Sequence, residues 1–278
     1  MTILSFTLFI AAGSFLAGFL GALTGLGGGV VVVPLLALVF GVDIRYAIGA
    51  SLVSVIATSS GAAAAYVREG YSNIRIGMFL EVATTLGAIL GAMIATHVTT
   101  GAIAVVFGVV LLYSAFISVR PQPPEVVDSS PDRLAQILKF NGTYPTPDGP
   151  SSYMVHRVPL GFGLMFGAGT LSGLLGIGSG AVKVLAMDKA MRIPFKVSTT
   201  TSNFMIGVTA AASAGIYLSR GYIDPGIAMP VMLGVLAGSL LGARILVVAR
   251  TRWLRLVFSA AIIVLGAEMI YSGFTGRL

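Results

Sequence analysis

The sequence has no cysteine and only two histidines, His97 and His156. Without cysteine there is no disulfide framework, no thiolate metal site and no cysteine nucleophile. Two histidines are too few for a histidine-based metal cage, so we expect no metal centre. Charge is scarce as well, because Asp, Glu, Lys and Arg make up 10% of the 278 residues, against roughly 25% in soluble domains. These shortages exclude a soluble enzyme, a disordered tail and a disulfide-bonded scaffold.

Apolar residues and glycine dominate what remains. The chain is 56% hydrophobic, contains 36 glycines and has a mean hydropathy of +0.96, which is more apolar surface than a soluble domain of this length could bury. We therefore expect a polytopic membrane protein. Residues 1–42 carry no Asp, Glu, Lys or Arg. This run is too long for the apolar region of a secretory signal and lacks a basic leader, so we interpret it as the first membrane segment of the protein.

Glycine-rich turns divide the uncharged runs into segments, and a spanning helix needs about 20 mostly apolar residues. The sequence predicts up to ten membrane helices, at 3–24, 28–41, 46–67, 76–97, 101–119, 158–176, 180–192, 197–219, 225–248 and 253–274. The segments 28–41 and 180–192 are short, which is typical of re-entrant segments. If they re-enter, the number of crossings falls to eight or six.

One polar stretch, residues 120–157, separates two apolar halves. It holds seven of the twelve prolines, so it is predicted to be a linker, with one short helix after Ser130-Pro131-Asp132. The expected domains are 1–119, 120–157 and 158–278. With a cytoplasmic linker, thirteen basic residues lie inside, and only Arg45, Arg220 and Arg277 lie outside. This asymmetry follows the positive-inside rule and places both termini outside.

The two halves are related in sequence, because a shift of 151 residues aligns them without a gap from Gly18 to Ala92. The shift superposes Gly25, Gly27 and Gly29 on Gly176, Gly178 and Gly180, Arg45 on Lys196, Ser51 on Ser202, and Gly70-Tyr71 on Gly221-Tyr222. We infer an internal duplication. Each half has an odd number of crossings, so the second copy is expected to be inverted. Inverted repeats are common in secondary transporters, which bind substrate near the membrane midplane between the repeats.

Glycine-rich turns precede the two short segments, as Gly27-Gly28-Gly29 and Gly178-Ser179-Gly180. Glycine lets backbone N–H groups converge without a Cβ, and a helix N-terminus is partly positive. Two such ends around a pseudo-two-fold axis would form an anion cradle. The alternative is close helix packing through small residues.

Hydroxyl groups cluster downstream of each turn. We predict that Ser51 in the first half and Thr200, Thr201, Ser202 and Asn203 in the second bind substrate. Neutral hydroxyl and amide groups can bind sulfonate, sulfite or carboxylate oxygens, or coordinate Na⁺. The alternative is that each hydroxyl bonds a carbonyl of its own helix.

Charged residues within apolar segments are candidates for function because charge is costly in a membrane. Lys183, three residues after Gly180, could face a substrate anion, pair with Asp188 or extend to an interface. Glu81 and Glu268 could carry a coupling proton. Arg45 and Lys196 could guard opposite mouths of a transport path, with plain anchoring as the alternative.

At these residues the chain resembles the TauE/SafE family of sulfite and organosulfonate exporters, also called TSUP permeases. The resemblance rests on Gly25-Leu-Gly-Gly-Gly29 with Val33-Pro34, on Gly49-Ala-Ser-Leu52, on the segment from Ser172 to Gly180, and on Thr200-Thr-Ser-Asn203. It covers both halves apart from residues 120–157. It implies a prokaryotic inner-membrane carrier of small, typically sulfur-containing anions. The second half departs from the family pattern, because Lys183-Val-Leu185 stands where a Val-Pro step is usual.

The sequence therefore predicts an all-α polytopic membrane protein, built from two inverted repeats of about five helices, that moves sulfite, sulfoacetate or another organosulfonate by alternating access. The expected partners are the anion, membrane lipid and, through glycine-rich helix faces, a second copy of the chain. We expect no cofactor beyond a coupling H⁺ or Na⁺, and no nucleic acid. The alternatives are an anion or small-solute channel and a carrier of small carboxylates. We expect no enzyme, because no His-Glu-x-x-His or Gly-x-Ser-x-Gly motif is present.

Overall fold

The computed structural model describes residues 3–24, 28–68, 71–119, 132–146, 149–246 and 251–277. These ranges form eleven α-helices, two π-helical turns and one β-hairpin, so the expected helical membrane fold is confirmed. The first half comprises α1 (Ile3–Thr24), α2 (Gly29–Pro34), the π-turn η1 (Leu35–Val39), α3 (Ile44–Arg68), α4 (Ile74–Ala95) and α5 (Thr100–Val119). The second half comprises α7 (Val158–Leu175), α8 (Gly180–Leu185), the π-turn η2 (Ala186–Ala190), α9 (Phe195–Ser219), α10 (Pro225–Leu246) and α11 (Thr251–Thr275).

The element bounds recur at the spacing found in the sequence. Displaced by 151 residues, α2, η1, α3 and α4 coincide at both ends with α8, η2, α9 and α10, and α5 starts where α11 starts. The π-turn recurs although Leu185 stands at the position of Pro34, so proline is not its cause. The helix caps recur too: the Asn73 side chain accepts the Ile76 N–H at 3.2 Å, and Asp224 Oδ1 accepts the Gly226 N–H at 2.6 Å.

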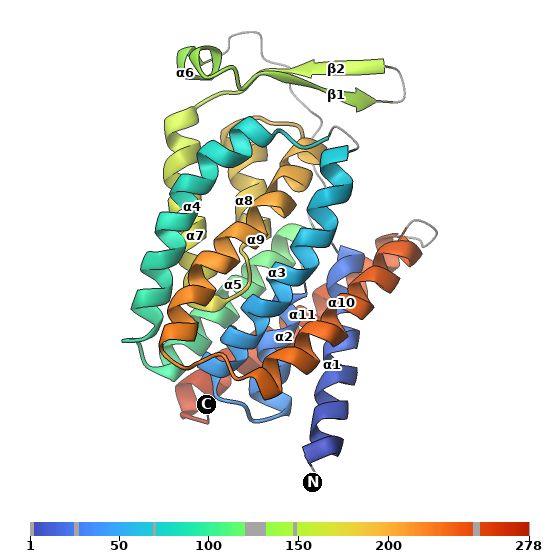
Figure 1. Cartoon of the computed structure of the whole chain (residues 1–278), viewed down its shortest axis with the longest axis vertical. Coiled ribbons are helices and arrows are strands. Elements are labelled where there is room, and N and C mark those ends of the chain that lie inside the picture. Colours follow the sequence, from blue (N-terminus) through green and yellow to red (C-terminus); the bar gives the residue numbers. More distant parts are fainter. Residues whose placement is uncertain are drawn as a thin grey trace.

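The long helices of each half pack mainly against helices of the other half. Helix α1 packs on α10 as α4 packs on α7, while α3 faces α9 and α5 faces α11. In Figure 1, α1 leads from the N-terminus toward the end that carries the hairpin, and α7 starts at that end and leads away. Glycine allows the closest crossings, because a Cβ on Gly87 would lie 2.1 Å from the Phe166 carbonyl oxygen and one on Gly238 2.0 Å from that of Phe15.

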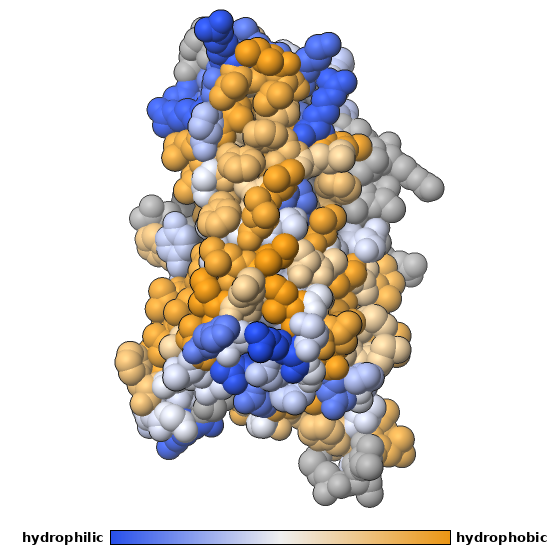
Figure 2. Space-filling model, turned by 60° about the vertical axis from the view of Figure 1, so that its left-hand side comes forward, coloured by the Kyte–Doolittle hydropathy of each residue, from blue (hydrophilic) through white to orange (hydrophobic). Residues whose placement is uncertain are grey.

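Large apolar side chains face outward on the long helices, for example Leu4, Val264 and Phe274. Figure 2 shows a broad apolar belt on one face, with hydrophilic residues above and below it. By length and composition, four of the described helices could cross a membrane: Leu4–Gly21, Ile74–Ala95, Val158–Leu175 and Pro225–Gly242. They form two pairs related by the repeat.

The short segments after the glycine turns are not full spans. Helix α2 with η1 covers residues Gly29–Val39, which at 1.5 Å per residue reaches about 16 Å, half of a hydrocarbon core of about 30 Å. The same length applies to α8 with η2. Neither short segment is therefore long enough to cross a membrane by itself.

The described part of the segment between the halves contains regular secondary structure. The predicted short helix is confirmed as α6 (Arg133–Ile137), capped by Asp132, which accepts the Leu134 N–H at 3.1 Å. A hairpin of β1 (Gly142–Thr146) and β2 (Gly149–Tyr153), not foreseen from the sequence, follows it. Phe140, Tyr153 and Val155 pack in one cluster with Ile76 and Met191, which fixes this segment over one end of the bundle (Figure 1). We call this the linker end.

Candidate functional site

The glycine turn of the first half packs closely against α3. The Gly28 carbonyl accepts the N–H groups of Val31 and Val32, both at 3.1 Å, and so starts α2. A Cβ on Gly29 would lie 2.8 Å from Ser51 Oγ and 2.9 Å from a methyl group of Val55. Close packing is thus observed at Gly28 and Gly29, whereas Gly27 lies outside the described residues.

The turn of the second half is left-handed and also closely packed. Gly176, Gly178 and Ser179 have φ angles of +68°, +69° and +44°, a region that favours glycine and strains serine. Ser179 is held there by a 2.7 Å hydrogen bond from its Oγ to the Ala168 carbonyl. Gly180 begins α8 with its Cα against Ile206, where a Cβ would come within 2.8 Å.

The repeat-related serines both bind the turn of the second half. Ser51 Oγ donates to the Gly176 carbonyl at 2.8 Å across the repeats, and Ser202 Oγ donates to the Gly180 carbonyl at 3.3 Å. Both serines are buried. Hydrogen bonds from α3 and from α9 therefore both hold the glycine turn at the start of α8.

The other predicted hydroxyls have separate roles. Thr200 Oγ1 donates to the Lys196 and Val197 carbonyls of its own helix, so the alternative of a self-bonded hydroxyl holds for it. Thr201 Oγ1 accepts the Asn73 N–H at 3.0 Å and joins α9 to the start of α4. Asn203 is half-buried on α9 and has no hydrogen-bond partner among the described residues.

A chain of hydrogen bonds links charged groups in the core. Lys183 Nζ donates to Thr209 Oγ1 at 2.5 Å, and Thr209 Oγ1 contacts Glu81 Oε1 at 2.6 Å. The side chain of Lys183 is fully buried and Glu81 is 7% exposed. Thr85 also donates to Glu81 Oε1, while Oε2 is buried and accepts no hydrogen bond from the described residues. We call Lys183, Thr209 and Glu81 the relay.

The relay corrects one prediction and extends another. Lys183 does not pair with Asp188, because Asp188 binds Lys189 at 2.8 Å, and it does not extend to an interface, because it is completely buried. Thr209 was missed from the sequence, since a lone threonine in an apolar helix is usually self-bonded. Its partner Glu81 lies on the other repeat, 128 residues away, so no local spacing indicated the contact.

Cations of the two repeats stack on tyrosines at opposite ends of the α3–α9 pair. The Arg45 guanidinium lies 5.6 Å from the Tyr222 ring centre, and Lys196 Nζ lies 3.9 Å from that of Tyr71. Arg45 also donates to the Val98 carbonyl at 2.9 Å. These pairs are related by the 151-residue shift, and each joins one repeat to the other. In the sequence, the two cations and the two tyrosines align separately at the 151-residue shift, and only the structure shows that each cation contacts a tyrosine of the other repeat.

Glu268 stands apart from these groups. It lies on α11, which packs mainly on α5, and its side chain is exposed with one 3.5 Å hydrogen bond from Ser272. The structure thus brings Glu81 to the predicted site and leaves Glu268 outside it.

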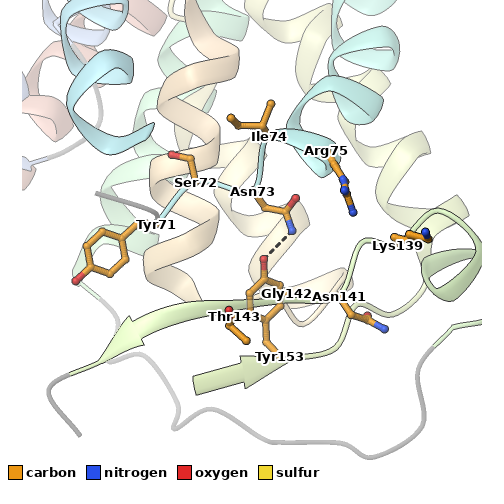
Figure 3. A pocket seen from close by; sticks show the side chains of 10 residues that line it. All are labelled: Tyr71, Ser72, Asn73, Ile74, Arg75, Lys139, Asn141, Gly142, Thr143 and Tyr153. Atoms are coloured by element: carbon orange, nitrogen blue, oxygen red, sulfur yellow. Dashed lines mark hydrogen bonds between the residues drawn. The ribbon is translucent and has the colours of Figure 1, made fainter. Parts of the chain in front are cut away.

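A cavity of about 270 Å³ opens at the linker end, between the start of α4 and the hairpin (Figure 3). Arg75 and Lys139 line it, and none of the described residues that line it is acidic. Asn73 Nδ2 donates to the Tyr153 hydroxyl at 2.7 Å at its inner wall (Figure 3). Burial raises the pKa of the Tyr153 hydroxyl, and the Asn73 hydrogen bond partly offsets that rise. The described lining of the cavity is therefore positively charged.

Comparisons with known proteins agree with this architecture. The family model described as "Sulfite exporter TauE/SafE" matches residues 10–269. The "probable membrane transporter protein YunE" of Bacillus subtilis is 25% identical, with 97% of this chain and 99% of that protein covered. "Probable membrane transporter protein MJ0441" of Methanocaldococcus jannaschii is also 25% identical, over 92% of each chain. A "probable membrane transporter protein" of Xylella fastidiosa is 27% identical over 87% of this chain and 85% of that one. No solved structure matches.

A match over nearly the whole chain, with a polytopic helical fold around a buried polar centre, identifies the molecule. The protein belongs to the sulfite exporter TauE/SafE family and is a multi-pass membrane transporter.

Proposed function

We propose that this transporter is a secondary carrier that moves a small sulfur-containing anion, such as sulfite, sulfoacetate or another organosulfonate, by alternating access. The observation that carries the proposal is Lys183. A fully buried lysine at the interface of two repeats has a high cost in a membrane, where embedded charge marks a substrate or ion path. An ammonium group is the natural counter-charge for a sulfonate or sulfite oxygen.

The proposed binding region surrounds the tip of α8. Lys183 is the fourth residue of the six-residue α8, which follows Gly178 and Ser179, and Ser51 and Ser202 donate to the carbonyls of Gly176 and Gly180 from the two repeats. A sulfonate exchanging for the serine–carbonyl bonds would meet two hydroxyl donors, and Lys183 of the same short helix would supply the counter-charge. Gly28, Gly29, Thr201 and Asn203 complete the wider proposed set, from the glycine turn of the first half and from α9.

Alternating access is supported by the packing of helices of each half against helices of the other half. Arg45 on Tyr222 and Lys196 on Tyr71 join the repeats at the two ends of the same helix pair. Release of one pair with retention of the other would open the centre to one side only, so each pair acts as a gate.

The membrane placement forms part of the proposal. The linker end carries Arg75, Lys139 and Lys196, in keeping with a cytoplasmic linker in a prokaryotic inner membrane and both termini outside. The basic cavity at the linker end would then gather anions from the cytoplasm before they reach the centre.

Ligand-dependent thermal unfolding of the purified protein tests the proposal. A ligand that binds only the folded state at one hundred times its Kd stabilises it by about 2.7 kcal/mol. We expect at least one of sulfite, thiosulfate, sulfoacetate and isethionate to raise the Tm, and Ser202→Ala to weaken that shift. A neutral sugar serves as the negative control. A shift with a cation or a neutral solute alone would contradict the substrate class.

A further inference from the structure

The charges of the relay balance each other inside the protein. Thr209 has one hydroxyl proton and two acceptors within reach, Glu81 Oε1 at 2.6 Å and the Met205 carbonyl of its own helix at 3.0 Å. The contact to the carboxylate is the shorter one, and a charged acceptor is the stronger one, so Lys183, Thr209 and Glu81 form one directed chain. The chain spans three helices, α8, α9 and α4, and both repeats. A movement that separates α4 from α9 would break it.

No other charged group described near the relay could replace either partner. Helix α7, packed against α4, carries no ionisable side chain. On α9, Lys196 stacks on Tyr71 at the linker end, and the Tyr217 hydroxyl donates to the Gly173 carbonyl at 3.2 Å. On η2, Asp188 binds Lys189.

The first repeat contains an equivalent of the relay that carries no charge. Displaced by 151 residues, Lys183, Thr209 and Glu81 correspond to Val32, Thr58 and Met232. Thr58 bonds only the Ser54 and Val55 carbonyls of its own helix. The fold thus packs an apolar version of the same crossing, so the charges are not required to build it.

We propose that the relay couples transport to protons: Glu81 holds the Lys183 charge until it is protonated, and the substrate anion then takes its place. This inference rests on the proposed function and specifies its coupling ion. A hydronium ion of the solution transfers its proton to the unpartnered oxygen Oε2 of Glu81, which forms an O–H bond and leaves a water molecule. Lys183 is then unbalanced, and one singly charged anion binds beside it.

The return step restores the starting state. The anion leaves on the other side of the membrane, the Glu81 O–H bond breaks, and the proton follows the anion. The buried centre has zero net charge both with Lys183 and Glu81 ionised and with Lys183, protonated Glu81 and the anion present. Each cycle moves one proton and one monovalent anion in the same direction, without net charge transfer.

Proton uptake on anion binding tests this inference. The protein in weakly buffered detergent solution, with a pH-sensitive dye, is titrated with isethionate, sulfoacetate and sulfite, and a protein-free blank removes the buffering of each anion. We expect one proton per singly charged anion bound, with affinity falling about tenfold per pH unit once Glu81 is ionised in the free protein. Glu81→Gln mimics the protonated acid, so it should bind the anion without proton uptake and without that pH dependence.

Matched variants separate the relay from its surroundings. Thr209→Val removes the bridging hydroxyl and should weaken the link between proton and anion, whereas Thr58→Val changes the related threonine and should leave it intact. Glu268→Gln tests the other membrane carboxylate. Binding without proton uptake in the wild type, uptake retained in Glu81→Gln, or uptake lost in Glu268→Gln alone would overturn the inference while the proposed function stands. If none of the anions binds, the proposed function itself fails.

Discussion

The sharpest prediction concerns the unfolding free energy of the protein when one or both charges of the relay are removed. We consider Glu81→Met, Lys183→Met and the double variant. Methionine has nearly the length of either side chain, and Met232 already occupies the position related to Glu81 by the repeat. The three variants therefore change charge with little change in packing volume.

The size of the effect follows from the geometry. Through Thr209, Lys183 Nζ and Glu81 Oε1 lie at most about 5 Å apart, a distance at which two unit charges attract by about 3 kcal/mol with an effective dielectric constant of 20. A single substitution leaves the other charge buried and unbalanced, which costs about 3–5 kcal/mol. Replacing both removes the attraction and both desolvation costs together, so the double variant should lie within about 1 kcal/mol of the wild type.

Equilibrium unfolding in detergent, followed by the fluorescence of the single tryptophan, measures all four proteins. The expected result is strong coupling: both single variants are clearly destabilised and the double variant is restored. Thr58→Met, in the apolar crossing of the other repeat, reports the cost of a packing change alone. If the double variant loses the sum of the two single losses, the two residues do not interact and the charge argument is wrong.

Three further predictions concern packing, gating and the linker. Gly173→Ala places a Cβ 2.0 Å from a carbonyl oxygen of α4 and should lower the unfolding free energy by about 1–3 kcal/mol, whereas Gly167→Ala, with open space around it, should change it by less than about 1 kcal/mol. Lys196→Gln removes a cation–π contact of about 0.5–2 kcal/mol and should loosen the gate that Lys196 forms with Tyr71. A reporter cysteine, introduced as Ser72→Cys in this cysteine-free chain, should then react several-fold faster with a water-soluble maleimide than in the chain that keeps Lys196. An unchanged rate would argue against a gate. Tyr153→Phe removes the hydroxyl that accepts from Asn73 at the start of α4, so limited proteolysis should cut the hairpin faster. In the wild type, docking should be fully present below the ordinary tyrosine pKa of about 10 and should weaken as the pH rises from there toward the raised pKa of Tyr153, because the neutral hydroxyl is the buried form.

Much of the helical layout could be predicted from the sequence because the physical signals are long-range averages. Hydropathy over a span and glycine at its turns placed the helices to within a few residues, and the 151-residue shift reproduces their bounds. The cap at Asp132 was also readable, since Ser-Pro-Asp before an apolar run is a helix-start signal. The hairpin was not, because its prolines and glycines are equally typical of an irregular linker.

The candidate site was predicted only in its parts. Lys183 and Glu81 stood out individually because membrane-embedded charge is unusual. Their connection through Thr209 depends on how α4 crosses α8 and α9, which no local pattern encodes. The hydroxyl cluster shows the reverse case: Thr200 belongs to a polar run, yet its hydroxyl serves only its own helix, while Thr201 joins two helices.

The most direct test of the central claim is anion counterflow in liposomes that contain the purified protein. Vesicles loaded with unlabelled sulfite or isethionate are diluted into a trace of the same anion carrying a radioactive label. A carrier with one alternating site should accumulate the label transiently above equilibrium, and Lys183→Met should abolish the overshoot. Entry of label to equilibrium without an overshoot would indicate a channel, and no protein-dependent entry of any sulfur-containing anion would contradict the proposed substrate class.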